Sequence, residues 1–328
     1  MLQSLIHGDI AMLLSRRAII SSALAASGAA LTGCSGTHAE QAPALSPKKN
    51  PFLLVHGAWH GTWCWGKISP LLAAAGHPVL AIDLPGHGLN AAFPAAFDVQ
   101  PRTAALATEL SPVAGITLAD YARAVANAVD SLLAAGFPAP IVVGHSMGGG
   151  AIHAAAELLG PGKIARLVYL AAFMPKDGQP MVAFPPDEQA PPSLLTPLLR
   201  SDPGITGALR LDPASTDESY RAGLIKLFYG KVDAATARAA LNLLSPDIPI
   251  GAMVTPIATS VQRWGAIPRT YIRTSTDNTI PPAMQDLMVA QADAATPANK
   301  TQVLQLDSDH SPFLSMPQQL VRALLSVA

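Results

Sequence analysis

The sequence predicts an α/β fold in which a mostly parallel sheet is covered by helices on both faces. From Pro51 onward, short apolar runs alternate with longer segments that have helical periodicity, and a single long helical segment interrupts this alternation. Alternating strands and helices imply parallel strands joined by crossover helices. The chain has 328 residues, half of them hydrophobic, which is enough for the core of one large domain of this class.

The runs that indicate buried strands are short and apolar, and most are rich in β-branched or aromatic residues. They are FLLV (52–55), PVLAID (78–83), PIVVG (140–144), RLVYLAA (166–172), RTYIRT (269–274) and QVLQL (302–306). Apolar residues at helical spacing predict helices over 118–135, 151–159, 284–292 and 317–327.

The alternation breaks over residues 175–268, which are rich in proline and contain short helical pieces; no strand is expected there. A helical insertion between two strands of one sheet is most simply a cap over the C-terminal strand ends, where open α/β sheets bind ligands. We therefore expect a core of 51–174 and 269–328 and a helical cap of 175–268. A second irregular excursion, 91–115, could border the same cleft.

The N-terminus predicts an export signal. A twin arginine precedes the uncharged stretch 18–33, as in bacterial Tat signals, and this stretch is short for a membrane span and diluted by Ser, Gly and Thr. LTGC then resembles a lipoprotein box in which Cys34 becomes lipidated. We expect 1–34 to be the signal and 35–50 a tether, which places the protein in the periplasm or cell envelope on a lipid anchor.

The composition of the chain argues against several classes of ligand and cross-link. A net charge of -1 without a Lys/Arg block argues against nucleic acid. The two cysteines, Cys34 and Cys64, allow no intramolecular disulfide once Cys34 is acylated or lost. No Cys/His cluster has metal-ligand spacing, so no metal or cofactor is expected. The oligomeric state is open.

The motif GHSMG (144–148) follows a predicted buried strand and precedes a predicted helix, the setting of a nucleophile elbow. Its glycines permit a sharp turn that would project the Ser146 hydroxyl above the sheet, with the N-terminus of the next helix beneath a developing oxyanion. The alternative, a phosphate-binding loop, lacks both the lysine and the G-x-G-x-x-G spacing. Ser146 is therefore the predicted nucleophile.

A serine nucleophile needs a histidine base, and in this type of fold the base comes last along the chain. His310 lies on a loop between the last predicted strand and the last predicted helix. By contrast, His145 belongs to the elbow, where its ring should point away from Ser146, and His153 belongs to the helix that follows. His310 is therefore the predicted base.

The base in turn needs an orienting carboxylate. Asp277 lies on the loop after the penultimate predicted strand, which is the required place. Asp307 and Asp309 are too close to His310 along the chain to reach the far side of its imidazole comfortably. Asp277 is the predicted acid; the alternative is that it is a turn residue only.

Two backbone N–H groups are expected to form an oxyanion hole. One belongs to Met147, directly after the nucleophile, and the other to Ala58, in the loop VHGAWHGTW after the first strand. Trp59, His60 and Phe173 are expected to line the substrate pocket.

Several separated stretches together carry a family resemblance. They are FLLVHGAWHGTWCWGKISPLLAAAGHPVLAIDLPGHG, VVGHSMGG, LVYLAAFMP, TDNTIPP and DHSPFLSMPQQL. In this order they resemble the α/β-hydrolase branch that holds plant methylesterases, hydroxynitrile lyases and bacterial esterases, including pyrethroid-type hydrolases. The resemblance covers most of 51–328 but is interrupted in the cap. It implies an α/β-hydrolase fold and the same assignments: Ser146, Asp277 and His310 as the triad, Ala58 and Met147 as oxyanion donors.

The function expected from these features is hydrolysis of a small to medium hydrophobic carboxylic ester through an acyl-enzyme. The lyases of this family carry a lysine right after the catalytic histidine, and here that position is Ser311, which favours hydrolysis. The alternatives are a hydroxynitrile lyase or an acyltransferase on the same triad, or a ligand-binding protein without catalysis.

Overall fold

The structure is a computed structural model, and it describes residues 48–182 and 193–328. The expected export signal, Cys34 and nearly all of the expected tether lie outside the described residues. So does a short piece of the insertion, residues 183–192.

A six-stranded sheet forms the centre of the described chain, and every pairing in it is parallel. The strand order is β2-β1-β3-β4-β7-β8. The strands are β1 (Phe52–Val55), β2 (Val79–Ile82), β3 (Ile141–His145), β4 (Arg166–Leu170), β7 (Arg269–Thr274) and β8 (Gln302–Leu306). Each coincides with a predicted apolar run, so the predicted α/β fold with a mostly parallel sheet is confirmed. After β1 the chain adds β2 on one side of that strand and then β3 on the other side, so the order of strands reverses between β1 and β3. Ligands of open α/β sheets bind at the C-terminal strand ends at such a point.

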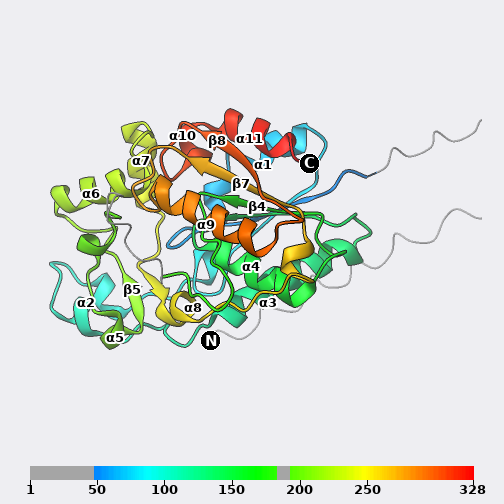
Figure 1. The fold of residues 1–328 in the computed structure, drawn as a ribbon. Helices are drawn as coiled ribbons and strands as arrows, with labels where there is room; N and C mark the ends of the chain where they lie inside the picture. The colour runs from blue at the N-terminus through cyan, green and yellow to red at the C-terminus, as the bar shows by residue number, and fades with distance from the viewer. Residues whose placement is uncertain (1–47, 183–192) are drawn as a thin grey trace, which may run out of the picture. The chain divides into compact units, whose positions relative to one another are not determined.

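Helices cover both faces of the sheet because successive strand residues point to opposite sides. Leu53 and Val55 belong to a buried cluster that also contains side chains of α3 (Leu118–Ala134), α4 (Gly148–Leu159) and α9 (Pro282–Ala295). Phe52 and Leu54 pack on the other side with α1 (Ser69–Ala74) and α11 (Pro317–Leu325). Figure 1 shows α3 and α4 on one side of the sheet and α11 on the other. Each large apolar side chain buried in this way contributes about 1.5–3 kcal/mol.

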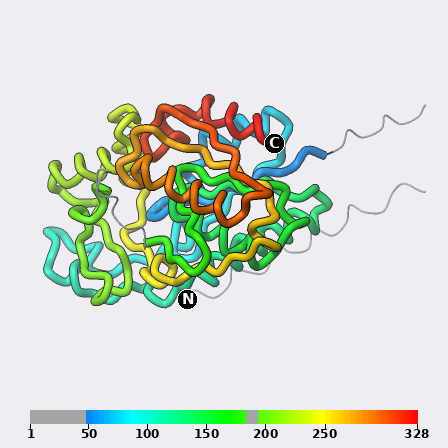
Figure 2. The backbone as a smooth tube through the Cα atoms, in the orientation of Figure 1, coloured from blue at the N-terminus to red at the C-terminus, as the bar shows by residue number. Residues whose placement is uncertain are grey.

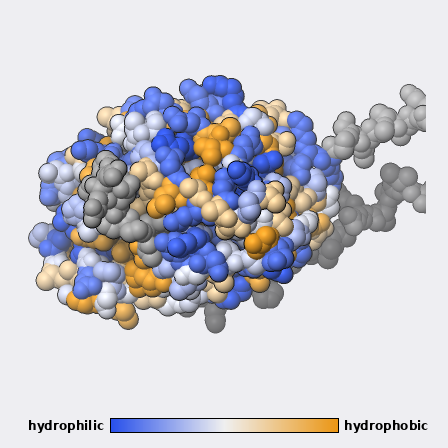
Figure 3. Space-filling model, viewed as in Figure 1, coloured by the Kyte–Doolittle hydropathy of each residue, from blue (hydrophilic) through white to orange (hydrophobic). Residues whose placement is uncertain are grey.

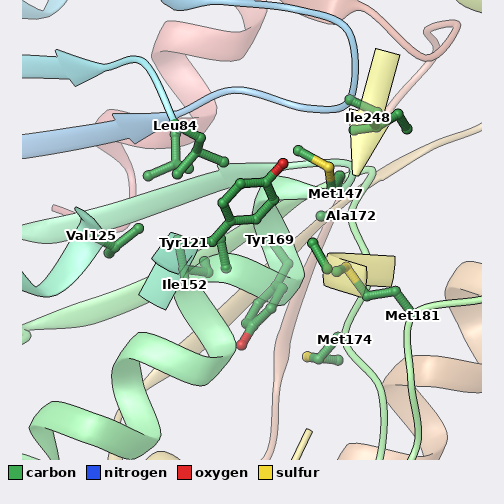
Figure 4. Close-up of a cluster of buried hydrophobic side chains, with 14 of the residues drawn as sticks. Leu84, Tyr121, Val125, Met147, Ile152, Tyr169, Ala172, Met174, Met181 and Ile248 are labelled. Carbon is green, nitrogen blue, oxygen red and sulfur yellow. The ribbon is translucent and has the colours of Figure 1, made fainter. Parts of the chain in front are cut away.

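Figure 4 shows part of the first of these clusters, with Val125 from α3, Ile152 from α4 and Tyr169 from β4. The start of α3 is fixed by a capping box: the Thr117 side chain accepts from the backbone N–H of Asp120, and the Asp120 carboxylate accepts from the backbone N–H of Thr117.

The described residues between β4 and β7 add no strand to the six-stranded sheet. Their elements are η4 (Thr196–Leu198), α5 (Pro203–Thr206), β5 (Ala208–Arg210), α6 (Glu218–Phe228), α7 (Ala234–Leu241), β6 (Asp247–Pro249), α8 (Ile250–Val254) and η5 (Trp264–Ala266). The expectation of no strand here was wrong, because β5 and β6 form an antiparallel pair. A buried bidentate ion pair joins these two strands, with Arg210 Nε 2.7 Å from Asp247 Oδ1 and Arg210 Nη2 2.7 Å from Asp247 Oδ2.

The excursion 91–115 packs against this insertion. It contains η3 (Ala95–Asp98) and α2 (Ala105–Thr108). The Ser111 N–H donates to the Thr206 carbonyl, and the Arg210 guanidinium donates to carbonyls in and just after α2. In Figures 1 and 2, α2, α5, β5, α6 and α7 gather on the same side of the sheet.

The face drawn in Figure 3 is mixed, with small hydrophobic groups between hydrophilic residues. Among the large hydrophobic side chains, Leu89 is 97% and Leu110 is 67% exposed, and both lie at or near the excursion. Within residues 48–182 and 193–328, no helix has the length and hydropathy needed to cross a membrane.

Candidate active site

The turn between β3 and α4 holds Ser146 in a left-handed conformation, with φ of 52°. Such a backbone costs a non-glycine residue about 1–3 kcal/mol and persists only when its surroundings impose it. The surroundings here are backbone hydrogen bonds: the Ser146 N–H donates to Leu170, while its carbonyl accepts from Gly149 and Phe173. The turn therefore has the geometry of a nucleophile elbow.

Glycine is required on both sides of this serine. A Cβ on Gly144 would lie 2.7 Å from the Gly148 carbonyl oxygen, and a Cβ on Gly148 would lie 2.5 Å from the His56 carbonyl oxygen. Both distances are well inside van der Waals contact. The glycines of GHSMG thus let β1, β3 and α4 approach one another behind the serine.

Asp277 and His310 form a short hydrogen bond, 2.7 Å between Oδ2 and Nδ1, and both side chains are buried. Asp277 follows β7 and His310 follows β8, so adjacent strands bring them together. The carboxylate is held in place because Oδ1 accepts from the backbone N–H groups of Thr279 and Ile280. Since a carboxylate accepts, Nδ1 carries a proton, and in the neutral ring Nε2 therefore has the lone pair that a base needs.

The two nearby aspartates do not contact the His310 ring. Asp307 is exposed and pairs with Lys231 and Ser275. Asp309 is buried, and its carboxylate accepts from groups on its own loop and from the backbone N–H of Lys231. Asp277 is thus the one of the three that the structure places on the imidazole.

The elbow and the His310 loop are in direct contact. The ring of His145 lies 4.6 Å from that of His310, centroid to centroid, and His145 Nε2 is 2.8 Å from the His310 carbonyl oxygen. Neither the Ser146 hydroxyl nor His310 Nε2 has a hydrogen-bond partner within the described residues. Hydrogen bonds between nucleophile and base are often long in the absence of substrate.

Two backbone donors beside Ser146 are free. The loop after β1 reaches the elbow so closely that a Cβ on Gly57 would lie 2.8 Å from Ser146 Cβ. Ala58 and Met147 are buried, yet within the described residues neither N–H donates to a protein acceptor. The Met147 side chain packs in the hydrophobic cluster of Figure 4. Buried N–H groups are nearly always paired, so two free ones beside a serine mark a place for an oxygen ligand.

Four other histidines surround the site, and all are buried. Burial lowers the pKa of His56 to about 4 and of His60 and His87 to about 3, and it lowers the pKa of His145 well below its ordinary value. These rings are therefore neutral at pH 7. His56 Nε2 accepts from the backbone N–H of Leu84, which ties the first loop to the chain after β2.

The residues expected to line a pocket lie beside the elbow. The Trp59 indole N–H donates to the Leu209 carbonyl, and both ring nitrogens of His60 are hydrogen-bonded to protein atoms. The backbone N–H of Phe173 donates to the Ser146 carbonyl. In the described part of the chain, no group of three or more His, Cys, Asp or Glu side chains is placed to hold a metal ion.

Sequence reasoning missed Tyr229, whose hydroxyl lies 2.9 Å from His60 Nε2. The two residues are 169 positions apart, and nothing in the pattern around Tyr229 indicates the contact. It also missed the bond from His145 to His310, although the position of His145 within the elbow is a signal that could have suggested one.

Comparisons with known proteins show the family to which the chain belongs. A family model described as "Alpha/beta hydrolase family" matches residues 52–323. Methylesterase 7 of Arabidopsis thaliana is 31% identical over 295 residues, which cover 84% of this chain and 95% of the relative. Putative methylesterase 11 of the same plant is 30% identical, and the match covers 85% of this chain but only 64% of the relative's length.

A solved structure of the pyrethroid hydrolase PytH is also similar. It matches with a TM-score of 0.65 and 26% identity, over 84% of this chain and 96% of the other. The expected resemblance to the branch with methylesterases and pyrethroid-type hydrolases is confirmed. Because the family model spans most of the sequence, the chain belongs to the alpha/beta hydrolase family.

Proposed function

We propose that this protein is a serine carboxylic-ester hydrolase with Ser146 as nucleophile, His310 as base and Asp277 as the orienting acid. The observation that carries the proposal is the buried Asp277–His310 hydrogen bond next to a serine on a left-handed elbow. The free N–H groups of Ala58 and Met147 support it. The similarity to methylesterases and to a pyrethroid hydrolase makes an ester the natural substrate class.

In the proposed mechanism, Ser146 Oγ attacks the ester carbonyl while His310 Nε2 takes its proton. The Ala58 and Met147 N–H groups stabilise the oxyanion of the tetrahedral intermediate. His310 then protonates the alcohol as it departs, and the acyl group stays on Ser146 as an acyl-enzyme. Water attacks this ester while His310 takes its proton, and His310 then passes the proton to Ser146 Oγ as the acid is released.

The experiment is hydrolysis of an ester panel that varies acyl and alcohol size and includes methyl esters, pyrethroid esters and short p-nitrophenyl esters. We expect activity on small to medium hydrophobic members. Ser146→Ala should lower kcat by at least about 10³-fold, because the elbow residue is the nucleophile. The matched control is Ser131→Ala, an exposed serine on α3 whose hydroxyl donates to the Asn127 carbonyl, and it should keep full activity. Full hydrolysis by Ser146→Ala would contradict the proposal.

The other reactions open to the same groups are tested in parallel. Cyanide release from mandelonitrile would support a lyase, and transfer of the acyl group to an added alcohol would support an acyltransferase. Ser311, which follows His310, is buried and uncharged, and this favours hydrolysis over the lyase reaction. A melting shift with a ligand but no turnover would support a binding protein.

We also propose that the protein is exported and lipid-anchored through Cys34. The support is the twin-arginine stretch and the LTGC box. Cys34→Ser should move the protein from the membrane fraction to the soluble fraction of the expressing bacterium, whereas Cys64→Ser, at a buried free thiol, should not. Equal distribution of both variants would contradict the anchor.

A further inference from the structure

The end of α6 and the turn after it, residues 226–231, contact all three loops of the proposed site. The first is the loop of the acid. The Asn278 side-chain amide donates to the Lys226 carbonyl across 2.9 Å, and the Thr279 hydroxyl donates to the Leu227 carbonyl across 3.0 Å. Both donors directly follow Asp277 in the chain.

The second contact is with the loop of the base. The backbone N–H of Lys231 donates to Asp309 Oδ2 across 2.8 Å, and the other oxygen of that carboxylate accepts from the N–H of Ser311. Asp309 and Ser311 flank His310. The Phe228 ring also lies 6.2 Å from the His310 ring, centroid to centroid.

The third contact is with the oxyanion loop, and it runs through two hydrogen bonds in series. His60 Nδ1 lies 2.7 Å from the Ala58 carbonyl oxygen, and His60 Nε2 lies 2.9 Å from the Tyr229 hydroxyl. A carbonyl can only accept, so Nδ1 carries the proton, Nε2 accepts, and the tyrosine donates. The pKa of His60, lowered by burial to about 3, keeps the ring in this neutral form.

The loop needs such support because its backbone is strained. Trp59 has a φ of 60°, which an aromatic residue adopts only when its surroundings hold it there. The insertion supplies two further restraints: Ser245 donates its N–H to the Trp59 carbonyl, and Leu209 accepts from the Trp59 indole. Ala58, immediately before Trp59, is the proposed oxyanion donor.

We propose that Tyr229 is a positioning residue for ester hydrolysis: through His60 it holds the Ala58 carbonyl, and thereby it restrains the loop residue that carries the proposed oxyanion N–H. This inference rests on the proposed function and adds a physical link between the insertion and the oxyanion hole. Tyr229 touches neither Ser146 nor His310 through a hydrogen bond, so its effect on the reaction passes through the loop.

The test is Tyr229→Phe, which removes the donor and keeps the ring. Loss of one hydrogen bond predicts a kcat about tenfold lower, with KM for p-nitrophenyl acetate changed less than about threefold. A trifluoromethyl ketone, which forms a tetrahedral oxyanion on a serine nucleophile, should bind weaker by the same factor as kcat falls. The matched control is Tyr220→Phe in α6, the helix that ends just before Tyr229. Its hydroxyl accepts from the Asp212 N–H and donates to the Leu198 carbonyl, both within the insertion, so kcat and inhibitor binding should stay at wild-type values.

A second variant separates positioning from loss of structure. His60→Asn keeps a donor near the Nδ1 position but offers no acceptor to Tyr229. If the two residues act through one relay, the double variant should be no slower than the slower single variant. Losses that multiply in the double variant would overturn the inference. So would wild-type kcat and inhibitor binding in Tyr229→Phe, and that result would leave the test of Ser146 as nucleophile unaffected.

Discussion

The ring of His145 donates a hydrogen bond from Nε2 to the backbone carbonyl of His310 across 2.8 Å. The direction follows because a carbonyl can only accept. The pKa of His145 is lowered well below its ordinary value by burial, so the donor is a neutral imidazole. The residue before the proposed nucleophile thus holds the backbone of the proposed base.

Replacing His145 should therefore change activity through the position of His310. His145→Leu leaves the carbonyl without its donor, and we expect kcat to fall about tenfold, the value of one hydrogen bond. His145→Gln carries an amide N–H at about the place of Nε2 and should stay within about threefold of wild type. Steady-state kinetics on a p-nitrophenyl ester measures both. Equal losses in the two variants would show that the hydrogen bond is not what matters.

Asp277→Asn tests the acid. The amide can keep the acceptor oxygen used by the Thr279 and Ile280 N–H groups, so the fold should be retained. It cannot stabilise the imidazolium or the required tautomer of His310, and kcat should fall by about 10³–10⁴-fold. Asp307→Asn, which removes an exposed carboxylate from the base loop, is the control and should retain activity within about threefold. Similar losses in both variants would argue against Asp277 as the acid.

Gly57→Ala tests the packing between the first loop and the elbow. The new Cβ would lie 2.7 Å from His145 Nδ1 and 2.8 Å from Ser146 Cβ, so the loop or the elbow must move. We expect the free energy of unfolding to fall by about 1–3 kcal/mol and kcat to fall at least tenfold. Gly115→Ala meets no atom within 4 Å and should be neutral or slightly stabilising. Chemical denaturation and kinetics measure both; an active, stable Gly57→Ala would contradict the close approach.

The buried histidines predict loss of stability in acid. Burial lowers the pKa of His56 to about 4 and of His60, His87 and His153 to about 3. In the unfolded chain these pKa values return to about 6.5, so below that pH the unfolded state binds protons that the native state does not.

The free energy of unfolding should therefore fall as pH falls through 6.5, by about 1.4 kcal/mol per pH unit for each of these histidines until the folded pKa is reached. Thermal melts followed by circular dichroism should give a steady Tm above pH 7 and a steep decline between pH 6 and pH 4.5. A Tm that is the same at pH 7 and pH 5 would contradict the neutral, buried state of these rings.

The sheet could be predicted from the sequence because each of its strands coincides with a short run that contains apolar residues. The inner strands β1, β3, β4 and β7 are almost fully buried, whereas the edge strand β2 is half-buried and the edge strand β8 is mostly exposed. The pair β5 and β6 could not. Each is three residues long, one ends in Arg210 and the other begins with Asp247, and the two charges are buried only because they pair with each other. The residues around Arg210 do not indicate that its partner is Asp247, which lies far away in the chain.

In the candidate site, too, some residues could be predicted from the sequence and others could not. Ser146, Asp277 and His310 stand out because each lies directly after a predicted strand, and parallel strands bring their C-terminal ends to one edge. The contact of Tyr229 with His60 joins the insertion to the core, and the insertion has no repeating pattern from which to place its helices. The sequence therefore indicates which residues could react, but it does not indicate which residues from the insertion hold them in place.

Covalent labelling shows whether Ser146 is the nucleophile. Wild-type protein and Ser146→Ala are incubated with a fluorophosphonate, which phosphonylates activated serines, and are then analysed by intact mass and peptide mapping. We expect one adduct per wild-type chain, on the peptide that contains Ser146, and none on the variant. An unlabelled wild-type chain, or the same adduct on Ser146→Ala, would show that Ser146 is not the nucleophile.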